Sequence, residues 1–402
     1  MAPNFQARST LINHIQHTLD FYEKRCVDSS GGFFHFFKDD GTVYDTRTRH
    51  LVSSTRFVFN YAMAFRQFGN PADLVRVRHG VAFVREVHRN DETGAYAWEL
   101  DWHEGKKTLC DGTNHCYGLA FVMLAYAHAL MAGMSEARAY LDETFALMEQ
   151  NFWQADYGLY ADEASEDWST LSPYRGQNAN MHSCEALIAA FEASGELRYL
   201  HRAETVANNI AVRQAALADD IVWEHYHANW TVDTEYNRHD SSNIFRPWGY
   251  QPGHLTEWTK LLLILERHQA QLQGSADWLL PRAKAFFDIA MEKAWDNEHG
   301  GIAYGFAPNG IICDGNKYFW VQAESLAAAA LLADRTEETH YWDWYEKICQ
   351  YSWAHMIDHQ YGAWYRMLSP ENGKLSDEKS PAGKTDYHTM GACYEVLNVL
   401  KN

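Results

Sequence analysis

Two kinds of apolar stretch alternate along the chain. The first kind has apolar residues at three- and four-residue spacing and charge on the other face, which predicts one-sided outer helices. We expect these helices at residues 7–28, 72–89, 135–153, 197–214, 277–296 and 340–358. The second kind is rich in alanine and poor in charge, and predicts inner helices at 57–65, 118–130, 185–193, 259–267, 325–333 and 393–400. A pair of helices therefore repeats six times.

The repeat predicts a closed ring. The inner helices are expected to open at Arg56, Tyr117, His182, His254, Gln322 and His388, which by subtraction lie 61, 65, 72, 68 and 66 positions apart. Because one helix pair cannot bury its apolar face alone, the units must pack on one another. Six units predict an all-α fold, an (α/α)6 barrel in a single domain over 1–402, with short hairpins or loops at the active-site end. An open helical solenoid is the alternative, but the polar terminal repeats that would cap it are not evident.

Local signals refine these boundaries. A glycine followed by aromatic residues comes after five of the six outer helices, where it is expected to form a left-handed cap. The fourth unit departs from this pattern, with Ile221-Val222-Trp223 and no glycine. Polar residues near the inner helices are expected to cap them, namely Ser53, Ser54, Asn178 and Thr256.

Composition narrows the classes of partner. A net charge of −19, from 34 basic and 53 acidic residues, disfavours nucleic acid and anionic membranes, which need clustered Lys and Arg. The longest apolar stretch, 120–133, is too short to span a bilayer, and the first residues lack the apolar core of a signal peptide. Seven scattered cysteines without a CxxC pair predict reduced thiols in a cytoplasmic protein.

The strongest candidate for chemistry is the segment QPGHLTEW at 251–258. A proline–glycine turn leads into a helix that begins with His254, and Glu257 follows on the same face. A carboxylate beside an imidazole orients the ring and raises its pKa. The alternative is that Glu257 only caps the helix while His254 is solvated. His388 has the same place in the last repeat, and two histidines at one repeat phase predict a proton-transfer site.

Other inner-helix openings carry residues that suit substrate binding. Asn178 and His182 are four residues apart and can share a helix face, where an amide and an imidazole suit the recognition of hydroxyl groups. The alternative is that Asn178 caps the helix and His182 is a packed core histidine. Arg56 is unfavourable at a helix start, so we expect an anionic partner for it, either a carboxylate or a developing oxyanion on the substrate. Tyr117 and Trp320 offer flat faces on which a sugar ring, or an ordinary core, would pack.

These segments resemble a known family. The pieces YRGQNANMHSCEALIAAFEASGE (174–196), QPGHLTEW (251–258) and TDYHTMGACYE (385–395), with the helix repeat over the whole chain, resemble the N-acylglucosamine 2-epimerase superfamily. Within it they look most similar to the aldose–ketose isomerases that act on free mannose, fructose and related sugars. The resemblance implies an (α/α)6 barrel that needs no metal or cofactor and moves a proton beside the carbonyl of a monosaccharide.

The resemblance also implies roles. His254 and His388 would be the acid–base pair, and Glu257 would support His254. The sugar would be bound by Arg56, Tyr117, Asn178, His182 and Trp320. Lys384 departs from the polar amide that related isomerases often have there, and this position bears on substrate preference.

The chemistry agrees with these residues. Ring opening exposes an aldehyde and acidifies the C2 proton, which a histidine can remove to give a cis-enediol(ate). Arg56 could stabilise the developing oxyanion. We therefore expect an isomerase that converts an unphosphorylated aldose such as D-mannose to its ketose. Return of the proton to the other face of C2 would instead make the protein an N-acetylglucosamine 2-epimerase.

Different classes stay open. The same barrel hosts glycoside hydrolases and lyases, and hydrolysis needs two facing carboxylates, for which Asp111 and Asp386 near the mouth are the candidates. A non-catalytic sugar-binding protein is a further alternative. His254 and Glu257 could ligate a metal, but there is no HExxH motif and no obvious third ligand. A homo-oligomer is left open.

Overall fold

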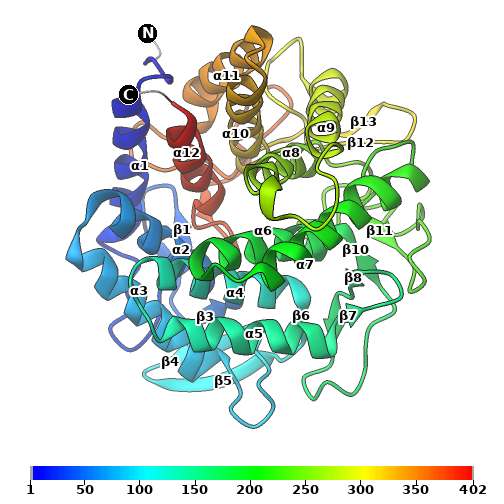
Figure 1. Ribbon diagram of the computed structural model, residues 1–402. Helices are drawn as coiled ribbons and strands as arrows, with labels where there is room; N and C mark the ends of the chain where they lie inside the picture. Colours follow the sequence, from blue (N-terminus) through cyan, green and yellow to red (C-terminus); the bar gives the residue numbers. More distant parts are fainter. Residues whose placement is uncertain (1–2, 401–402) are drawn as a thin grey trace.

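Figure 1 shows a computed structural model of the protein, which describes residues 3–400. The described residues form twelve α-helices in two groups. The outer group is α1 (Arg8–Glu23), α3 (Pro71–Phe83), α5 (Ala137–Asn151), α7 (Leu197–Asn208), α9 (Leu279–Ala294) and α11 (Thr339–Tyr351). The inner group is α2 (Leu51–Phe68), α4 (Cys116–Met131), α6 (Gln177–Ser194), α8 (Pro252–Arg267), α10 (Phe319–Thr336) and α12 (Tyr387–Val399).

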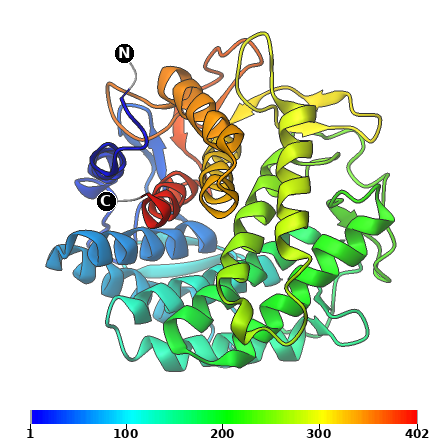
Figure 2. The same ribbon diagram turned by 45° about the horizontal axis from the view of Figure 1, so that its top comes forward.

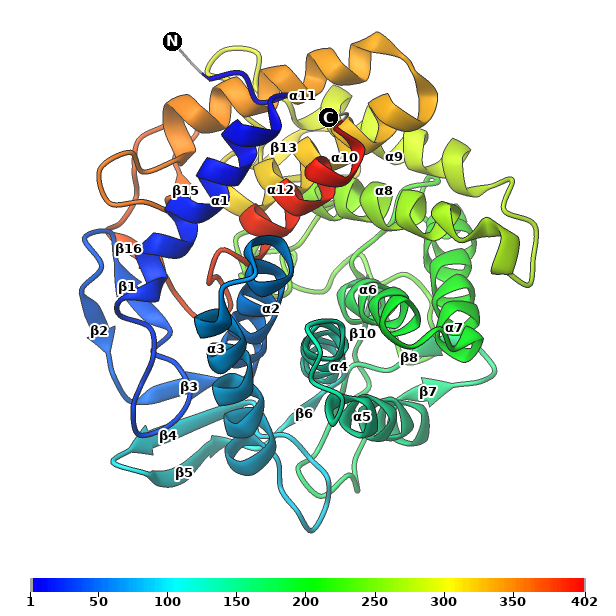
Figure 3. The same ribbon diagram turned by 60° about the vertical axis from the view of Figure 1, so that its left-hand side comes forward.

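The inner helices form a closed ring (Figure 3). Each of them packs against the next along the chain, and α12 packs against α2. The first and last helices, α1 and α12, lie side by side (Figure 2), where Nη1 of Arg8 donates to the carbonyl oxygen of Leu397 at 2.5 Å. The predicted (α/α)6 barrel is therefore confirmed, and the open solenoid is wrong.

The two groups differ in the way that their composition predicts. The outer helix α1 buries one stripe, which includes Leu11, Ile15 and Leu19, and exposes its opposite face. The inner helix α10 is buried over most of its length, and its alanines 327–330 have no exposed surface. Small residues let an inner helix pack closely on both sides, which a ring between an outer layer and a central axis requires.

The outer helices match the predicted ranges closely. Three of them continue beyond their α-helical part into wider π-helical turns, at Val84–His88, Asn209–Gln214 and Ser352–Met356. Two short 3-10 turns follow at Ala215–Leu217 and Gln269–Gln271. None of the described helices is long and apolar enough to cross a membrane.

Short antiparallel strands occupy the connections that lead from each outer helix to the next inner helix. They are β1 (Phe36–Lys38), β2 (Val43–Asp45), β3 (Thr48–His50), β4 (Glu99–His103), β5 (Lys106–Asp111), β6 (Asn114–His115), β7 (Trp153–Gln154), β8 (Leu159–Tyr160), β9 (Glu163–Ala164), β10 (Arg175–Gly176), β11 (His225–Tyr226), β12 (Gly305–Phe306), β13 (Ile312–Asp314), β14 (Lys317–Tyr318), β15 (Met367–Leu368) and β16 (Glu378–Ser380).

Many of these strands join neighbouring units. The pairs β16–β1, β3–β4, β6–β9, β10–β11 and β14–β15 each link one repeat to the next, and a single bridge between Tyr250 and Phe306 links the remaining two. The pairs form a belt around the end of the barrel where the inner helices begin. The connections at this end are therefore tied to one another, which holds the side chains that they carry in place.

Two local predictions were wrong. The glycines expected to cap the outer helices lie in the turns after them; Gly158, for example, has φ +62° between β7 and β8. The inner helices α2, α6 and α10 begin three to five residues earlier than predicted, at Leu51, Gln177 and Phe319. The predictions placed the helix starts at polar residues, whereas the first turns are largely buried and follow directly on the strands.

The expected capping residues are wrong for the same reason. Ser53 and Ser54 lie inside α2, Asn178 inside α6 and Thr256 inside α8. The N-terminus of α2 is capped by His50, whose Nδ1 accepts from the backbone N–H of Val52 at 3.2 Å.

Candidate active site

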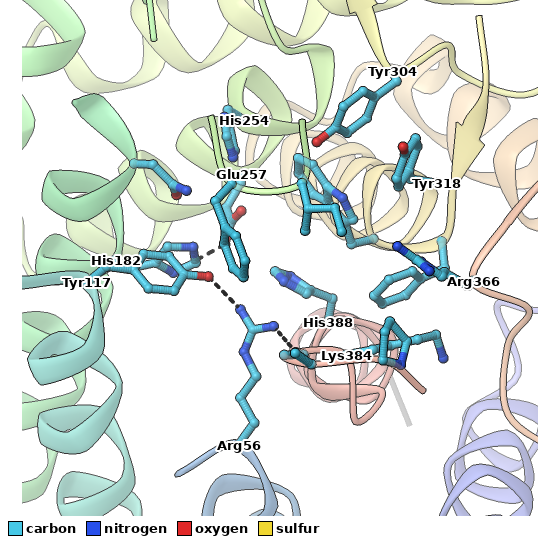
Figure 4. A pocket seen from close by; sticks show the side chains of 18 residues that line it. Arg56, Tyr117, His182, His254, Glu257, Tyr304, Tyr318, Arg366, Lys384 and His388 are labelled. Carbon is cyan, nitrogen blue, oxygen red and sulfur yellow. Dashed lines mark hydrogen bonds and ion pairs between the residues drawn. The ribbon is translucent and has the colours of Figure 1, made fainter. Parts of the chain in front are cut away.

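A pocket lies at the N-terminal ends of the inner helices (Figure 4). Its cavity volume is about 100 Å³. All six inner helices contribute to its lining, through Arg56, Tyr117, Asn178, His182, His254, Glu257, Trp320 and His388. The structure therefore brings together all eight site residues that were selected from the sequence.

His254 is the third residue of α8 and is buried. Its Nδ1 lies 3.0 Å from both carboxylate oxygens of Glu224, which immediately precedes β11. Glu224 also accepts from Nε2 of Gln177 at 3.0 Å, and Oε1 of Gln177 accepts from Nε1 of Trp258 at 2.8 Å. This chain of buried bonds fixes the imidazole plane of His254 and turns its Nε2 away from the carboxylate.

His388 is held in a similar way at the start of α12. Its Nδ1 lies 2.7 Å from Oε1 of Glu324 on α10. The residue that caps the helix, Asp386, has a left-handed backbone with φ +53°, and its Oδ2 accepts from Tyr22 and Lys384. These bonds stabilise a conformation that is unfavourable for aspartate and fix the helix start. Burial, reinforced by nearby cations, holds the pKa of His388 well below its ordinary value, so the ring is neutral.

Glu257 does not support His254, which corrects the prediction from the sequence. Within residues 3–400, neither of its carboxylate oxygens has a hydrogen-bond partner. Its nearest charged neighbours are Nδ1 of His182 at 3.9 Å and Nζ of Lys260 at 4.0 Å. Burial and the nearby Glu324 raise the pKa of Glu257 well above its ordinary value. A carboxyl group in this state can donate a hydrogen bond to a substrate hydroxyl.

His182 occupies the second turn of α6, with Nδ1 3.0 Å from Oε2 of Glu185. Its ring contacts those of Tyr117 and Phe121, with centroids 5.0 and 4.8 Å away. Asn178 lies one turn earlier on α6 and also lines the pocket, and its Oδ1 is buried without a hydrogen-bond partner in the described chain. The predicted shared face is therefore confirmed, and the amide oxygen is free to accept from a ligand.

Arg56 extends toward Tyr117 across the pocket (Figure 4). Its Nη2 donates to the hydroxyl of Tyr117 at 3.2 Å, and its Nη1 donates to the carbonyl oxygen of Gly383. The guanidinium also lies over the rings of Phe121 and Tyr387, at 4.3 and 4.7 Å. Among the described residues no carboxylate forms an ion pair with Arg56, so the expected protein anion is not its partner.

Trp320 lies close to both histidines. Its ring centroid is 5.0 Å from that of His254 and 5.8 Å from that of His388. The position depends on Gly253, because a Cβ there would lie 2.4 Å from Cζ3 of the indole. The residue before His254 must therefore lack a side chain for this aromatic wall to form.

The remaining cations of the pocket wall are already neutralised. Lys384 bonds to Asp386, and burial lowers the pKa of Lys384 to about 8. Arg366 pairs with Glu378. Glu257 is the one carboxylate among the described lining residues. Asp386 and Asp111, the candidates for a hydrolase, do not line the pocket, which corrects their expected place at its mouth.

The comparisons with known proteins agree with this geometry. The family model of N-acylglucosamine 2-epimerase (GlcNAc 2-epimerase) matches residues 32–392. The chain belongs to the N-acylglucosamine 2-epimerase family. It is 52% identical over 399 residues to the D-mannose isomerase of Marinomonas mediterranea, covering 99% of each chain. It is 33% identical over 359 residues to the D-mannose isomerase of Thermobifida fusca, covering 88% of this chain and 86% of that one.

A solved structure extends the likeness to three dimensions. The crystal structure of a D-mannose isomerase superposes with a TM-score of 0.95 at 52% identity, covering 99% of this chain and 100% of that chain. The resemblance stated from the sequence is thereby confirmed. This member of the N-acylglucosamine 2-epimerase family is a carbohydrate isomerase in the broad sense that includes epimerases.

Sequence reasoning missed the carboxylates that hold the histidines. Glu324 occupies the same position in α10 as Glu257 in α8, five residues after the first residue of the helix. The late start predicted for α10 hid this correspondence. Glu224 follows directly on the one segment that lacks the repeated glycine, so the irregularity marked its place. Glu185 and Lys260 face the axis of the barrel one turn beyond pocket residues, and no motif pointed to them.

Two groups of side chains have donor atoms close enough for a metal ion. They are His182, Glu185 and Glu257, and Glu257, Glu324 and His388, with donor atoms within 4.8 Å of one another. In both groups the donor nitrogen is Nδ1, because Nδ1 of His182 and of His388 bonds to a carboxylate of the same group. Of the two ligands suggested by the sequence, Glu257 belongs to both groups and His254 belongs to neither.

Proposed function

We propose that this enzyme interconverts D-mannose and D-fructose, as free monosaccharides, by proton transfer between C2 and C1. The observation that carries the proposal is the pair His254 and His388. Each has its Nδ1 bound to a buried carboxylate, and both rings lie beside Trp320 in one pocket. An imidazole held in this way keeps Nε2 available for a proton at neutral pH.

The proposed reaction begins with the open-chain sugar. One histidine removes the C2 proton through Nε2. The C2–H electron pair forms the C1–C2 double bond, and the carbonyl electrons move to the oxygen at C1 to give a cis-enediol(ate). Arg56 stabilises the oxygen that becomes negative, because its charge is not matched by a carboxylate in the described chain. A proton is then delivered to C1, which gives the ketose. The second histidine transfers the proton between the two oxygens.

The other polar residues bind and orient the sugar in this proposal. Trp320 offers its indole face to the carbon chain, and Tyr117 and His182 form the opposite wall with Asn178. The free Oδ1 of Asn178 accepts from a hydroxyl, and Glu257 donates to one. The burial of these groups favours a polyhydroxyl ligand, because each unpaired polar atom gains a partner when the sugar binds.

The charges of the pocket favour an unphosphorylated substrate. Lys384 and Arg366 are each paired with a carboxylate of the protein. Arg56 is then the one cation of the described lining that is left for the substrate, and it is engaged with uncharged groups. A phosphate dianion would need several unpaired donors, whereas a neutral sugar with one developing negative charge needs only one.

We also propose that the enzyme works as one domain over 1–402 and in the cytoplasm. All seven cysteines are free, and only Cys110 is exposed. Reduced thiols in this number support a reducing compartment.

Proton NMR of the purified enzyme with D-mannose in D2O tests the proposal. We expect D-fructose to appear with deuterium at C1, and D-mannose re-formed by the reverse reaction to carry deuterium at C2, since the transferred proton exchanges on the histidine. N-acetylmannosamine formed from N-acetylglucosamine, without turnover of mannose, would make the protein a 2-epimerase instead. Release of reducing ends from an oligosaccharide, with every monosaccharide unchanged, would overturn proton transfer as the reaction.

A further inference from the structure

A second cavity lies on the barrel axis, on the other side of the residues that form the base of the pocket. All six inner helices line it, and its lining includes Glu185, Lys260, Glu324 and Tyr387. None of these four residues lines the pocket that contains the histidines. Each of them nevertheless contacts a pocket residue or the partner of one, so the two spaces are separated by a single layer of ionisable side chains.

Lys260 is connected to His388 through one carboxylate. Its Nζ lies 2.5 Å from Oε2 of Glu324, and Oε1 of Glu324 lies 2.7 Å from Nδ1 of His388. All three side chains are at least nine-tenths buried. A lysine in the middle of a buried helix is unusual, and here its ammonium group contacts the acid that holds a pocket histidine.

Glu324 needs a cation to stay ionised in this environment. Burial raises the pKa of Glu324, and Lys260 opposes that rise. Glu185 lies nearby, and its charge also opposes a negative charge on Glu324. An ionised Glu324 accepts a hydrogen bond from the Nδ1–H group, which keeps the ring proton on Nδ1 and leaves Nε2 of His388 unprotonated. A neutral Glu324 would donate to Nδ1 instead and place the ring proton on Nε2, where it blocks the base.

We propose that Lys260 is a positioning residue of the isomerisation, which keeps Glu324 ionised from behind the pocket and thereby keeps His388 in the tautomer that can accept the sugar proton. The inference rests on the proposed function, because it assigns a role in that reaction. Lys260 does not line the pocket, and of its two carboxylate neighbours Glu324, at 2.5 Å, is much closer than Glu257, at 4.0 Å.

The other charged and titratable groups around this chain do not replace Lys260. They are Arg56 on α2, His182 and Glu185 on α6, His254 and Glu257 on α8, and Tyr387 on α12. Arg56 is engaged with Tyr117 and Gly383, and the remaining groups are carboxyls, a phenol and imidazoles. Lys260 is therefore the cation that contacts Glu324 in the described chain.

The test compares Lys260→Met with Lys260→Arg and with Lys379→Met. Lys379 is also buried in an ion pair, 2.6 Å from Asp358, but lies outside both cavities, so it controls for the loss of a buried charge.

In Lys260→Met we expect the acidic limb of the kcat/KM profile to move up by about one pH unit. The sign follows because loss of the cation raises the apparent pKa of the Glu324–His388 pair. At pH values well above that limb, KM of Lys260→Met should stay within about twofold of the wild-type KM. Lys260→Arg should restore the wild-type pH profile, and Lys379→Met should have the wild-type profile.

A profile of Lys260→Met that superposes on the wild-type curve would overturn the proposal. If that variant does not fold, Glu324→Gln and Glu324→Gln/Lys260→Met are compared, since the neutral amide no longer needs the cation. Equal acidic limbs in these two support the proposal, and a further shift in the double variant contradicts it.

A measurement without substrate separates this inference from the proposed function. The ¹⁵N shifts of the His388 imidazole report which nitrogen carries the proton. At a pH between the acidic limbs of the two proteins, we expect the proton on Nδ1 in the wild type and on Nε2 in Lys260→Met. Unchanged shifts would refute the role of Lys260, whereas the absence of turnover with every sugar in the wild type would refute only the proposed function.

Discussion

The two pocket histidines are held in the same way by different parts of the molecule. The partner of His254 is Glu224, which comes from the strand belt and is fixed by Gln177. The partner of His388 is Glu324, which comes from the neighbouring inner helix. One imidazole is therefore oriented from the loop end of the barrel, and the other from within the helical wall.

This difference separates what each histidine depends on. The main chain of Glu224 is tied to α6, because its carbonyl oxygen accepts from the N–H of Gln177 at 3.1 Å beside the β10–β11 ladder. A change in that ladder should reach His254 and leave His388 unaffected. A change in the charge behind the pocket should reach His388 first. The same chemical arrangement thus has two structural origins, which can be perturbed separately.

Removal of either ring should have the largest effect. We expect His254→Ala and His388→Ala each to lower kcat by about 10² to 10⁴-fold, because each loses a proton-transfer group. Turnover of D-mannose is the measurement, and circular dichroism with the thermal midpoint checks the fold. Wild-type turnover in both variants would remove the two histidines from the reaction.

Neutralisation of the carboxylates should have the next largest effect and should distinguish the two sites. Glu224→Gln and Glu324→Gln keep the shape of the side chain but lose the charge that fixes the imidazole tautomer, and we expect kcat to fall roughly tenfold or more in each. The ¹⁵N shifts of both imidazoles should show that Glu224→Gln changes His254 and Glu324→Gln changes His388. Equal changes at both rings in either variant would contradict the separation of the sites.

A smaller effect is expected where the two sites share a wall. In Gly253→Ala the new Cβ would overlap the indole of Trp320, so the ring must move away from both histidines. An aromatic face contributes about 0.5–1.5 kcal/mol, so KM for mannose should rise roughly two- to tenfold while the thermal midpoint changes little. Gly391→Ala is a suitable control, because its Cβ would meet only ordinary contacts at 3.7 Å.

The smallest effect should come from chelation. Nδ1 of His182 and of His388 bonds to a carboxylate, so a metal ion would have to displace these bonds. We expect dialysis against EDTA to leave kcat within about 10% of its starting value, which is the precision of the assay. An enzyme that uses a catalytic metal ion would lose activity under this treatment. A loss of activity that added Zn²⁺ or Mn²⁺ restores would assign a metal to one of the two groups.

The sequence predicted the repeat, the barrel and eight of the eighteen residues that line the pocket, because hydrophobic periodicity and helix phase are local properties. It did not predict which carboxylate contacts which histidine. Glu257 follows His254 by three residues, so a single helix suggested that pair, yet the ring turns toward Glu224 on another segment. Contacts between repeats depend on how far each helix is rotated in the ring, and the spacing within one helix does not contain that information.

The bond from Arg8 to Leu397 joins residues 389 positions apart, and it closes a ring whose pocket draws on every inner helix. Loop-closure entropy grows only with the logarithm of length, so this closure costs about 1.6 kcal/mol more than one across a single repeat. The closure is nevertheless a late event, because long-range contacts form slowly. A refolding chain should regain its helical signal well before any activity, and its catalytic competence therefore reports the moment at which the last repeat meets the first.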